Sequence, residues 1–419
     1  MTRMKESGID WIGQIPEEWE MSKIRYLVTT RSEKRITDSS VPYIGLENIE
    51  SQTGKFVKTG IQVDKSENIV VEIGDVLFGK LRPYLRKYWR ATFTSTASSE
   101  FLVFQSSELD MNFLYYAIQS DSFIEEVNTS TYGSKMPRAS WEYIKNMRIA
   151  FPTSLVEQQK IADFLDKKTA QLDKVKTILE EQIQKLKDYR ASLIYETVTK
   201  GLDKTVPMKD SGIDWIGQVP EGWGVIKFKY LGDVKQGLTY SPSDIVDKDE
   251  GILVLRSGNI QNGILEFNNN VYVKTKVVES IILRKNDILI TARNGSPALI
   301  GKNAIIDTDI KATFGAFMMV FRANKSLFAK FAFYLMNVSF NFYRTFFTTS
   351  TVNQLTAAIF NGIEVPLPSI YEQKKITDFL DEKTVQIDKL IQIKNQQIEN
   401  INKQRQTLIY DYVTGKRRV

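Results

Sequence analysis

Positively charged and aromatic side chains crowd one short stretch of this 419-residue sequence. Basic and aromatic residues alternate closely over eleven positions, among them Lys80, Arg82, Tyr84, Arg86, Lys87, Tyr88 and Arg90. Arginine and lysine neutralise phosphate oxygens, and arginine can donate two hydrogen bonds to the edge of guanine. The stretch therefore predicts contact with nucleic acid, the alternative being a loop whose charges simply face water.

Polar loops elsewhere in the chain offer the same chemistry. One loop covers residues 132–141 and a second covers residues 348–355, and further arginines fall in or beside turns. Asparagine and glutamine can pair with the edge of adenine, and all of these side chains can hold phosphates. The predicted nucleic-acid contacts are Lys80, Arg82, Arg86, Lys135, Arg138, Trp141, Arg256, Arg293, Asn294, Asn353 and Gln354.

Catalytic chemistry is restricted by two absences, because the sequence contains no histidine and no cysteine. Disulfides, zinc fingers, cysteine nucleophiles and histidine-based triads are therefore excluded. Gly74–Lys80 (GDVLFGK) resembles the start of a phosphate-binding loop, but Leu81 stands where Ser or Thr would ligate magnesium. We expect no catalytic residue, no metal site and no cofactor in this chain, which favours a binding protein over an enzyme.

Charge and hydropathy favour a cytoplasmic protein that makes no membrane contact. The net charge of +6 permits an anionic partner without requiring one. Met1–Asp10 is polar and lacks the apolar core of a signal peptide. The most apolar stretch, Phe328–Phe347, is interrupted by Lys330, Asn337 and Arg344, which makes it too polar to cross a membrane.

An internal repeat determines the predicted architecture. Met4–Leu27 and Met208–Leu231 are identical at 16 of 24 positions and share the segment SGIDWIGQ. Glu157–Lys174 and Glu372–Lys389 are identical at 13 of 18 positions. The chain is therefore two copies of one unit whose intervening stretches have diverged.

Each diverged stretch is expected to form an α+β domain. Short runs rich in β-branched and aromatic residues occur in the same order in both copies and predict strands. The paired runs are 41–49 with 251–260, 74–78 with 286–290, and 101–104 with 318–321. A helix is predicted after each set, at Met111–Glu126 and at Leu327–Phe347.

The repeated segments Glu157–Thr199 and Glu372–Thr414 predict two long helices, since neither contains an internal Pro or Gly. Apolar residues recur along both at spacings of mostly three or four, as in a coiled coil. The predicted seam is Leu165, Leu172, Val175, Leu179, Leu186, Leu193, Leu380, Ile387, Leu390, Ile401 and Leu408. Because the chain alternates domain and helix, we expect the two helices to pair antiparallel, with pseudo-two-fold symmetry.

The expected fold class is α+β, with two duplicated α+β domains joined by the two helices of an antiparallel coiled coil. The predicted boundaries are residues 1–156 for the first domain, 157–200 for the first spacer helix, 201–371 for the second domain and 372–419 for the second helix and tail.

These features resemble the specificity (S) subunits of type I restriction–modification systems. The resemblance covers essentially the whole chain and is strongest in WIGQIPEEWE (11–20), WIGQVPEGWG (215–224), SKMPRASW (134–141) and the P-x-x-x-E-Q-x-x-I-x-x-F-L-D entry to each helix. It implies that each variable domain reads one half of a split, asymmetric double-stranded DNA target. The helices would set the spacer and dock two modification subunits, which bind S-adenosylmethionine and methylate adenine. Restriction subunits would bring the translocase and nuclease, with ATP and magnesium.

One alternative of another class remains at this stage. The duplicated coil would be an assembly scaffold, and the two variable domains would bind protein ligands. A self-sufficient nuclease or methyltransferase is disfavoured, because the sequence shows neither a glycine-rich cofactor cradle nor a methyltransferase motif.

Overall fold

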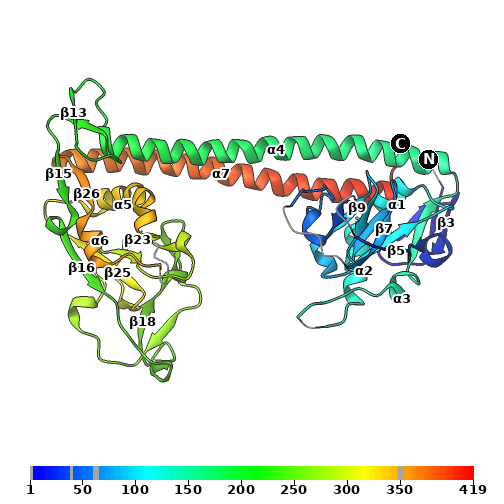
Figure 1. The fold of residues 1–419 in the computed structure, drawn as a ribbon, viewed down its shortest axis with the longest axis horizontal. Coiled ribbons are helices and arrows are strands. Elements are labelled where there is room, and N and C mark those ends of the chain that lie inside the picture. Colours follow the sequence, from blue (N-terminus) through cyan, green and yellow to red (C-terminus); the bar gives the residue numbers. More distant parts are fainter. Residues whose placement is uncertain (1–2, 38–40, 60–65, 134, 348–352) are drawn as a thin grey trace. The chain divides into compact units, whose positions relative to one another are not determined.

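The computed structural model describes residues 3–37, 41–59, 66–133, 135–347 and 353–419. The chain divides into two compact units (Figure 1). Unit 1 comprises Met1–Glu181 together with Lys394–Val419, and unit 2 comprises Gln182–Ile393. Each unit thus contains one variable domain, the part of one long helix that follows it in the sequence, and a part of the other long helix.

Unit 1 is built on two four-stranded sheets and two short ladders. The first sheet has the order β4 (Thr29–Thr30), β11 (Phe101–Gln105), β8 (Val76–Gly79), β9 (Tyr88–Arg90). The second has the order β5 (Lys34–Ile36), β7 (Glu67–Val71), β10 (Ser95–Ala97), β6 (Tyr43–Ile44). The ladders are β1 (Met4–Glu6) with β2 (Gln14–Pro16), and β3 (Trp19–Lys23) with β12 (Arg148–Pro152). The short helices are α1 (Met111–Ala117), α2 (Asp121–Thr129) and α3 (Trp141–Ile144).

Unit 2 repeats the first of these sheets and changes the second. The repeated sheet has the order β16 (Gly232–Gln236), β25 (Met318–Ala323), β22 (Ile288–Thr291), β23 (Asn303–Ile305). The other has the order β17 (Ile245–Val246), β21 (Val271–Val273), β18 (Ile252–Leu255), β24 (Ala312–Phe314). Three ladders pair β13 (Met208–Asp210) with β14 (Gln218–Pro220), β15 (Gly224–Lys227) with β26 (Glu364–Leu367), and β19 (Ile260–Gln261) with β20 (Ile264–Leu265). The helices of its variable domain are α5 (Ala329–Tyr343) and α6 (Ala357–Gly362).

The predicted single helix over residues 111–126 is wrong, because two helices occupy this stretch. Ser120 adopts an extended backbone between α1 and α2, and its hydroxyl donates to the carbonyl of Ala117. A serine that bonds to the backbone in this way competes with helix continuation and favours a helix start. In unit 2 the helix predicted for residues 327–347 is present. It consists of α5 followed by a 3-10 turn at Arg344–Phe347.

The two long helices are α4 (Leu155–Lys200) and α7 (Ile370–Val413). In unit 1 the ring of Phe164, near the start of α4, lies 4.5 Å from that of Tyr412, at the end of α7. In unit 2 Arg190, late in α4, pairs with Asp388 of α7 at 3.2 Å. The early residues of each helix therefore meet the late residues of the other, which confirms the antiparallel pairing.

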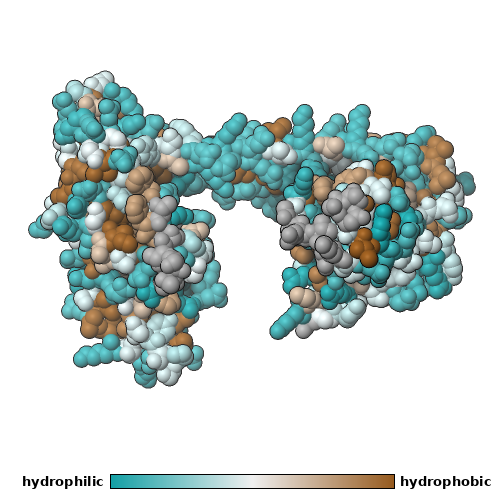
Figure 2. Space-filling view, in the orientation of Figure 1, coloured by the Kyte–Doolittle hydropathy of each residue, from teal (hydrophilic) through white to brown (hydrophobic). Residues whose placement is uncertain are grey.

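Burial varies along the predicted seam. Leu165 and Leu380 are fully buried, whereas Val175 and Leu390 are 48% and 47% exposed. Leu179 and Ile387 are buried, and five seam residues are half-buried: Leu172, Leu186, Leu193, Ile401 and Leu408. In the view of Figure 2, the visible surface of the two helices is mostly hydrophilic.

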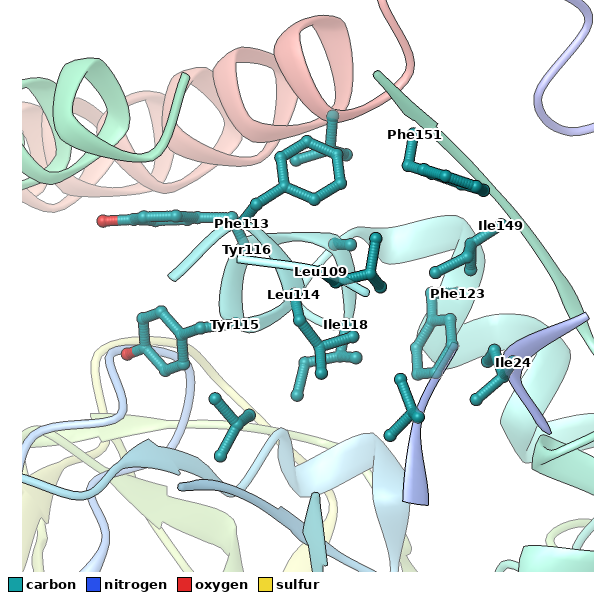
Figure 3. Packing of buried hydrophobic residues seen from close by; sticks show 14 of the residues in the cluster. Ile24, Leu109, Phe113, Leu114, Tyr115, Tyr116, Ile118, Phe123, Ile149 and Phe151 are labelled. Atoms are coloured by element: carbon teal, nitrogen blue, oxygen red, sulfur yellow. The ribbon is translucent and has the colours of Figure 1, made fainter. Parts of the chain in front are cut away.

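In each unit, one hydrophobic core joins the variable domain to both helices. In unit 1 Phe113 of α1, Phe123 of α2 and Ile149 of β12 pack together with Leu165 of α4 and Ile409 of α7 (Figure 3). In unit 2 the equivalent core includes Phe331 of α5, Ile194 of α4 and Leu380 of α7. The repeated residues at the start of each long helix explain how this joint is made.

Three polar residues of the repeated helix entry bind the domain in the same way in both units. The carboxylate of Glu157 accepts from the indole of Trp19 at 3.1 Å, and that of Glu372 accepts from Trp223 at 3.0 Å. Asp166 accepts from the hydroxyl of Tyr116 at 2.6 Å, as Asp381 accepts from that of Tyr334 at 2.8 Å. The third residue is the glutamine that follows the glutamate. Repetition of these residues in the sequence thus reflects one joint that is built twice.

Substitution of this glutamine in unit 2, Gln373, is expected to lower the free energy of unfolding strongly. Gln373 is fully buried; its side-chain oxygen accepts from the backbone N–H of Phe328 at 2.7 Å, and its amide donates to the carbonyls of Ser326 and Pro368. Gln373→Leu would leave these backbone groups unpaired in the interior. We expect a loss of about 2 kcal/mol or more in the free energy of unfolding, measured by denaturant titration followed by circular dichroism.

A matched control lies on the same helix. Gln386 is exposed and bonds only to neighbouring side chains of α7. Gln386→Leu should change the free energy of unfolding by no more than about 0.5 kcal/mol. Equal effects of the two substitutions would contradict the role assigned to Gln373.

Candidate nucleic-acid interface

In unit 1 three of the predicted contacts line one pocket. Lys80, Arg138 and Trp141 surround a hollow of about 360 Å³ together with Glu100 and Tyr132. Lys80 follows directly after β8; its backbone N–H donates to the carbonyl of Glu100 at 2.8 Å, and its carbonyl accepts from Ala139 at 2.9 Å. The loop at residues 132–141 is thereby attached to the end of the sheet.

A bidentate ion pair closes this pocket. Arg138 Nη2 lies 2.8 Å from Glu100 Oε1, and Arg138 Nε lies 3.1 Å from Glu100 Oε2. Hydrogen bonding from Arg138 holds the pKa of the Glu100 carboxyl below its ordinary value, and the guanidinium charge acts in the same direction. Burial lowers the pKa of the neighbouring Lys80 ammonium, although the charge of Glu100 opposes this shift. The fork of Arg138 is therefore occupied within the protein.

The Arg138–Glu100 pair predicts a pH-dependent contribution to stability. Because the pKa of Glu100 is lowered in the folded chain, its contribution is present above about pH 4.3, the ordinary value for Glu, and is lost as the pH falls through the folded value. Arg138→Gln should thus destabilise the chain at neutral pH and progressively less in acid, measured by thermal unfolding across pH. In a Glu100→Gln background, Arg138→Gln should show no such dependence; persistence of the dependence there would assign it to another group.

The other predicted residues of unit 1 lie around this pocket in different settings. Arg82 donates to the carbonyl of Lys135 at 3.2 Å, and Lys135 itself is exposed. Arg86 pairs with Asp121, the first residue of α2, at 2.5 Å. The ring of Trp141 lies 5.7 Å from that of Phe104 and packs against the core. The structure thus brings together Lys80, Arg82, Lys135 and Arg138, and places Arg86 against α2.

All five predicted residues of unit 2 lie together. Arg256, Arg293 and Asn294 line a pocket of about 650 Å³ whose remaining wall is mainly apolar. Asn353 donates to the carbonyl of Gly295 at 3.2 Å, and Gln354 accepts from Arg293 Nη2 at 2.7 Å. Asn294 accepts from the backbone N–H of Ser296 at 3.0 Å and so shapes its own turn.

Backbone hydrogen bonds establish which positions of the two loops correspond. Ala139 donates to the carbonyl of Lys80, and Leu355 donates to that of Ala292. Lys80 donates to the carbonyl of Glu100, and Ala292 to that of Phe317. Arg138 therefore corresponds to Gln354, Glu100 to Phe317 and Leu81 to Arg293. Ser134 and residues 348–352 of these loops lie outside the described residues.

Two residues of this interface were missed by reasoning from sequence. Glu100 and Phe317 each directly precede a predicted strand, and nothing in their local pattern links them to Arg138 or Arg293. The link is the antiparallel pairing of β8 with β11 and of β22 with β25, which places Thr291 opposite Met318. The sequence also gives no sign that the side chain of Phe317 is 61% exposed, because an aromatic residue next to a strand is usually expected in the core.

Comparison with known proteins identifies the family. The profile of the type I restriction modification DNA specificity domain matches residues 16–187 and again residues 220–403. The chain belongs to this family. The specificity subunit of the type I restriction enzyme EcoKI from Escherichia coli K12 is 31% identical over 206 residues, which are 48% of this chain and 44% of that subunit. The MjaVIII specificity subunit of Methanocaldococcus jannaschii is 24% identical over 97% of this chain and 94% of that subunit.

Solved structures of the type I family share the fold. A chain from a study of complex assembly and conformational transition of the type I R-M system superposes with a TM-score of 0.74 at 17% identity, covering 95% of this chain and 98% of that chain. The HsdS subunit from Thermoanaerobacter tengcongensis superposes with a TM-score of 0.51 at 17% identity, covering 96% of this chain and 98% of that subunit. The predicted family and fold class are confirmed.

The EcoKI and MjaVIII relatives are both named specificity subunits of type I restriction enzymes. The comparisons give no support to the alternative of a protein-binding scaffold. Among the described residues, no helix is long and apolar enough to cross a membrane. Within the same part of the chain, no three acidic residues gather where they could hold a metal ion.

Proposed function

We propose that this specificity subunit reads a split DNA target, one half with each variable domain. The observation that supports this most strongly is the correspondence between the two loop sites. One backbone frame carries Arg138 and Glu100 in unit 1, and Gln354, Phe317 and Arg293 in unit 2. Two loop sites that share the same backbone arrangement but carry different polar side chains are suited to bind two different base sequences.

The long helices α4 and α7 would set the distance between the half-sites and dock two modification subunits. Both helices carry exposed apolar side chains that a partner could cover, among them Val175, Ile178 and Leu390. Joining two modest binders by a stiff spacer raises affinity through effective concentration, provided that the geometry fits the target. Adenine methylation, with S-adenosylmethionine, would belong to the modification subunits, and ATP-driven translocation and cleavage, with magnesium, to the restriction subunits.

Salt-dependent binding tests the DNA-reading role. The complex of this chain with its modification subunit should bind duplex DNA with an affinity that falls steeply as salt is raised, because Lys and Arg contacts release counterions from phosphates. Fluorescence anisotropy on a labelled genomic fragment, together with retention on heparin, would measure this. A well-formed complex that fails to bind DNA at low salt would contradict the proposal. It would favour the alternative in which the chain is a scaffold that binds protein ligands.

A further inference from the structure

The pocket of unit 2 is positively charged and partly apolar. Arg256 and Arg293 both line it, and none of its described lining residues is an aspartate or glutamate. Phe317 and Ile245 in its wall are 61% and 48% exposed. Two uncompensated guanidinium groups beside exposed apolar side chains are typical of a surface that a flat anionic partner covers.

Arg293 is held in one orientation on the wall of this pocket. Its Nη2 donates to Gln354 Oε1 at 2.7 Å, and its guanidinium lies 5.8 Å from the centre of the Phe317 ring. Its backbone N–H also donates to the carbonyl of Phe317 at 3.0 Å. An amide on one side and an aromatic ring on the other restrict the plane of the guanidinium.

Most donors of this guanidinium are left free. An arginine side chain has five N–H donors, and the described contacts of Arg293 occupy one of them. No carboxylate of the residues that the structure describes lies within ion-pair distance of it. A planar, oriented and unpaired fork is suited to the O6 and N7 atoms of guanine, which accept two parallel hydrogen bonds in the major groove.

Unit 1 has no such fork at the corresponding position. Leu81 stands where unit 2 has Arg293, and Arg138 stands where unit 2 has Gln354. The fork of Arg138 is bound to both carboxylate oxygens of Glu100. The pocket of unit 1 is lined by Glu100 and Glu142 as well as by Lys80 and Arg138, whereas the described lining of the unit 2 pocket contains no acidic residue.

We propose that Arg293 reads a guanine of the half-site bound by the second domain, and that Gln354 and Phe317 position it. This inference rests on the proposed function and adds a specificity-determining residue with a stated base. A phosphate contact is the competing role for an exposed arginine. It would not need an oriented plane, and it would weaken binding to every sequence alike when removed.

A base analogue distinguishes these roles. The complex with the modification subunit is first used to define the target sequence, and each guanine of the second half-site is then replaced by 7-deazaguanine, which lacks the N7 acceptor but keeps normal pairing. At one position the wild-type complex should lose about tenfold in affinity, because one of the two hydrogen bonds of the bidentate base contact is lost. The Arg293→Ala complex should bind both duplexes equally.

Two further variants sharpen the comparison. Gln354→Ala should reduce the discrimination between guanine and 7-deazaguanine, because Arg293 loses its hydrogen-bonding partner. Arg284→Ala removes an exposed arginine of the same domain, which pairs with Glu279 at 3.8 Å, and should leave the discrimination intact.

Each outcome bears on a different statement. Equal loss for wild type and Arg293→Ala, or a second half-site without guanine on either strand, would overturn the reading role of Arg293 while leaving the proposed function standing. Weaker binding of Arg293→Ala with unchanged base preference would assign it to a phosphate and overturn the inference. Absence of any split target for the wild-type complex would instead overturn the proposed function.

Discussion

Deleting seven residues from each long helix is expected to abolish methylation at the natural spacing while leaving both half-site sequences unchanged. The two helices keep the same register in both units. Asp173 pairs with Arg405 in unit 1 and Arg190 pairs with Asp388 in unit 2, and the two pairs are separated by equal numbers of residues along α4 and α7. Removing 178–184 from α4 and 394–400 from α7 therefore preserves the facing pairs on either side. At 1.5 Å per residue the spacer would shorten by about 10 Å, or roughly three base pairs.

The measurement is a map of methylated adenines in cells that express each variant with the modification subunit. Any motif that remains methylated should keep the half-site bases and lose only spacer length. As a control, deleting seven residues from α4 alone should break the register and abolish complex formation. An unchanged spacer in the paired deletion, or altered half-sites, would contradict the role of the helices as a ruler.

Replacing the first variable domain by a copy of the second is expected to give a symmetric target. The contacts that join domain to helix are repeated, as in the pairs Trp19–Glu157 and Trp223–Glu372. Residues 28–153 can therefore be exchanged for residues 232–368 at equivalent positions of the repeat. If antiparallel helices present the two domains to DNA in opposite directions, the second half-site should appear twice, inverted, and the first should disappear.

The reciprocal replacement, with two copies of the first domain, is the matched control and should yield the other symmetric target. Methylome mapping reads out both variants. Retention of the first half-site after its domain has been removed would show that the domains are not independent readers.

Much of the fold could be predicted from the sequence because the chain contains two copies of the same unit. Identity between the two copies located the helix entries and the WIGQ segments, and short runs of β-branched and aromatic residues located β8, β11, β22 and β25. The absence of Pro and Gly predicted α4 and α7 to within a few residues of their ends. These features depend on local pattern, which a sequence displays directly.

Features that depend on contacts between distant residues could not be predicted. Strand pairing decides that Glu100 meets Arg138 and that Phe317 meets Arg293, and no spacing in the sequence encodes either meeting. The break at Ser120 was missed because its residues suit a helix apart from one hydroxyl that bonds to the backbone. Val175 and Leu390 fit the apolar spacing of the seam yet are about half exposed, because spacing alone does not say which side chains another element covers.

Single-molecule sequencing of a genome methylated by this chain and its modification subunit tests the central claim most directly. The account predicts methylated adenines within one motif of two short, different half-sites separated by a gap of constant length. A continuous motif, or methylation without sequence preference from a well-formed complex, would contradict it.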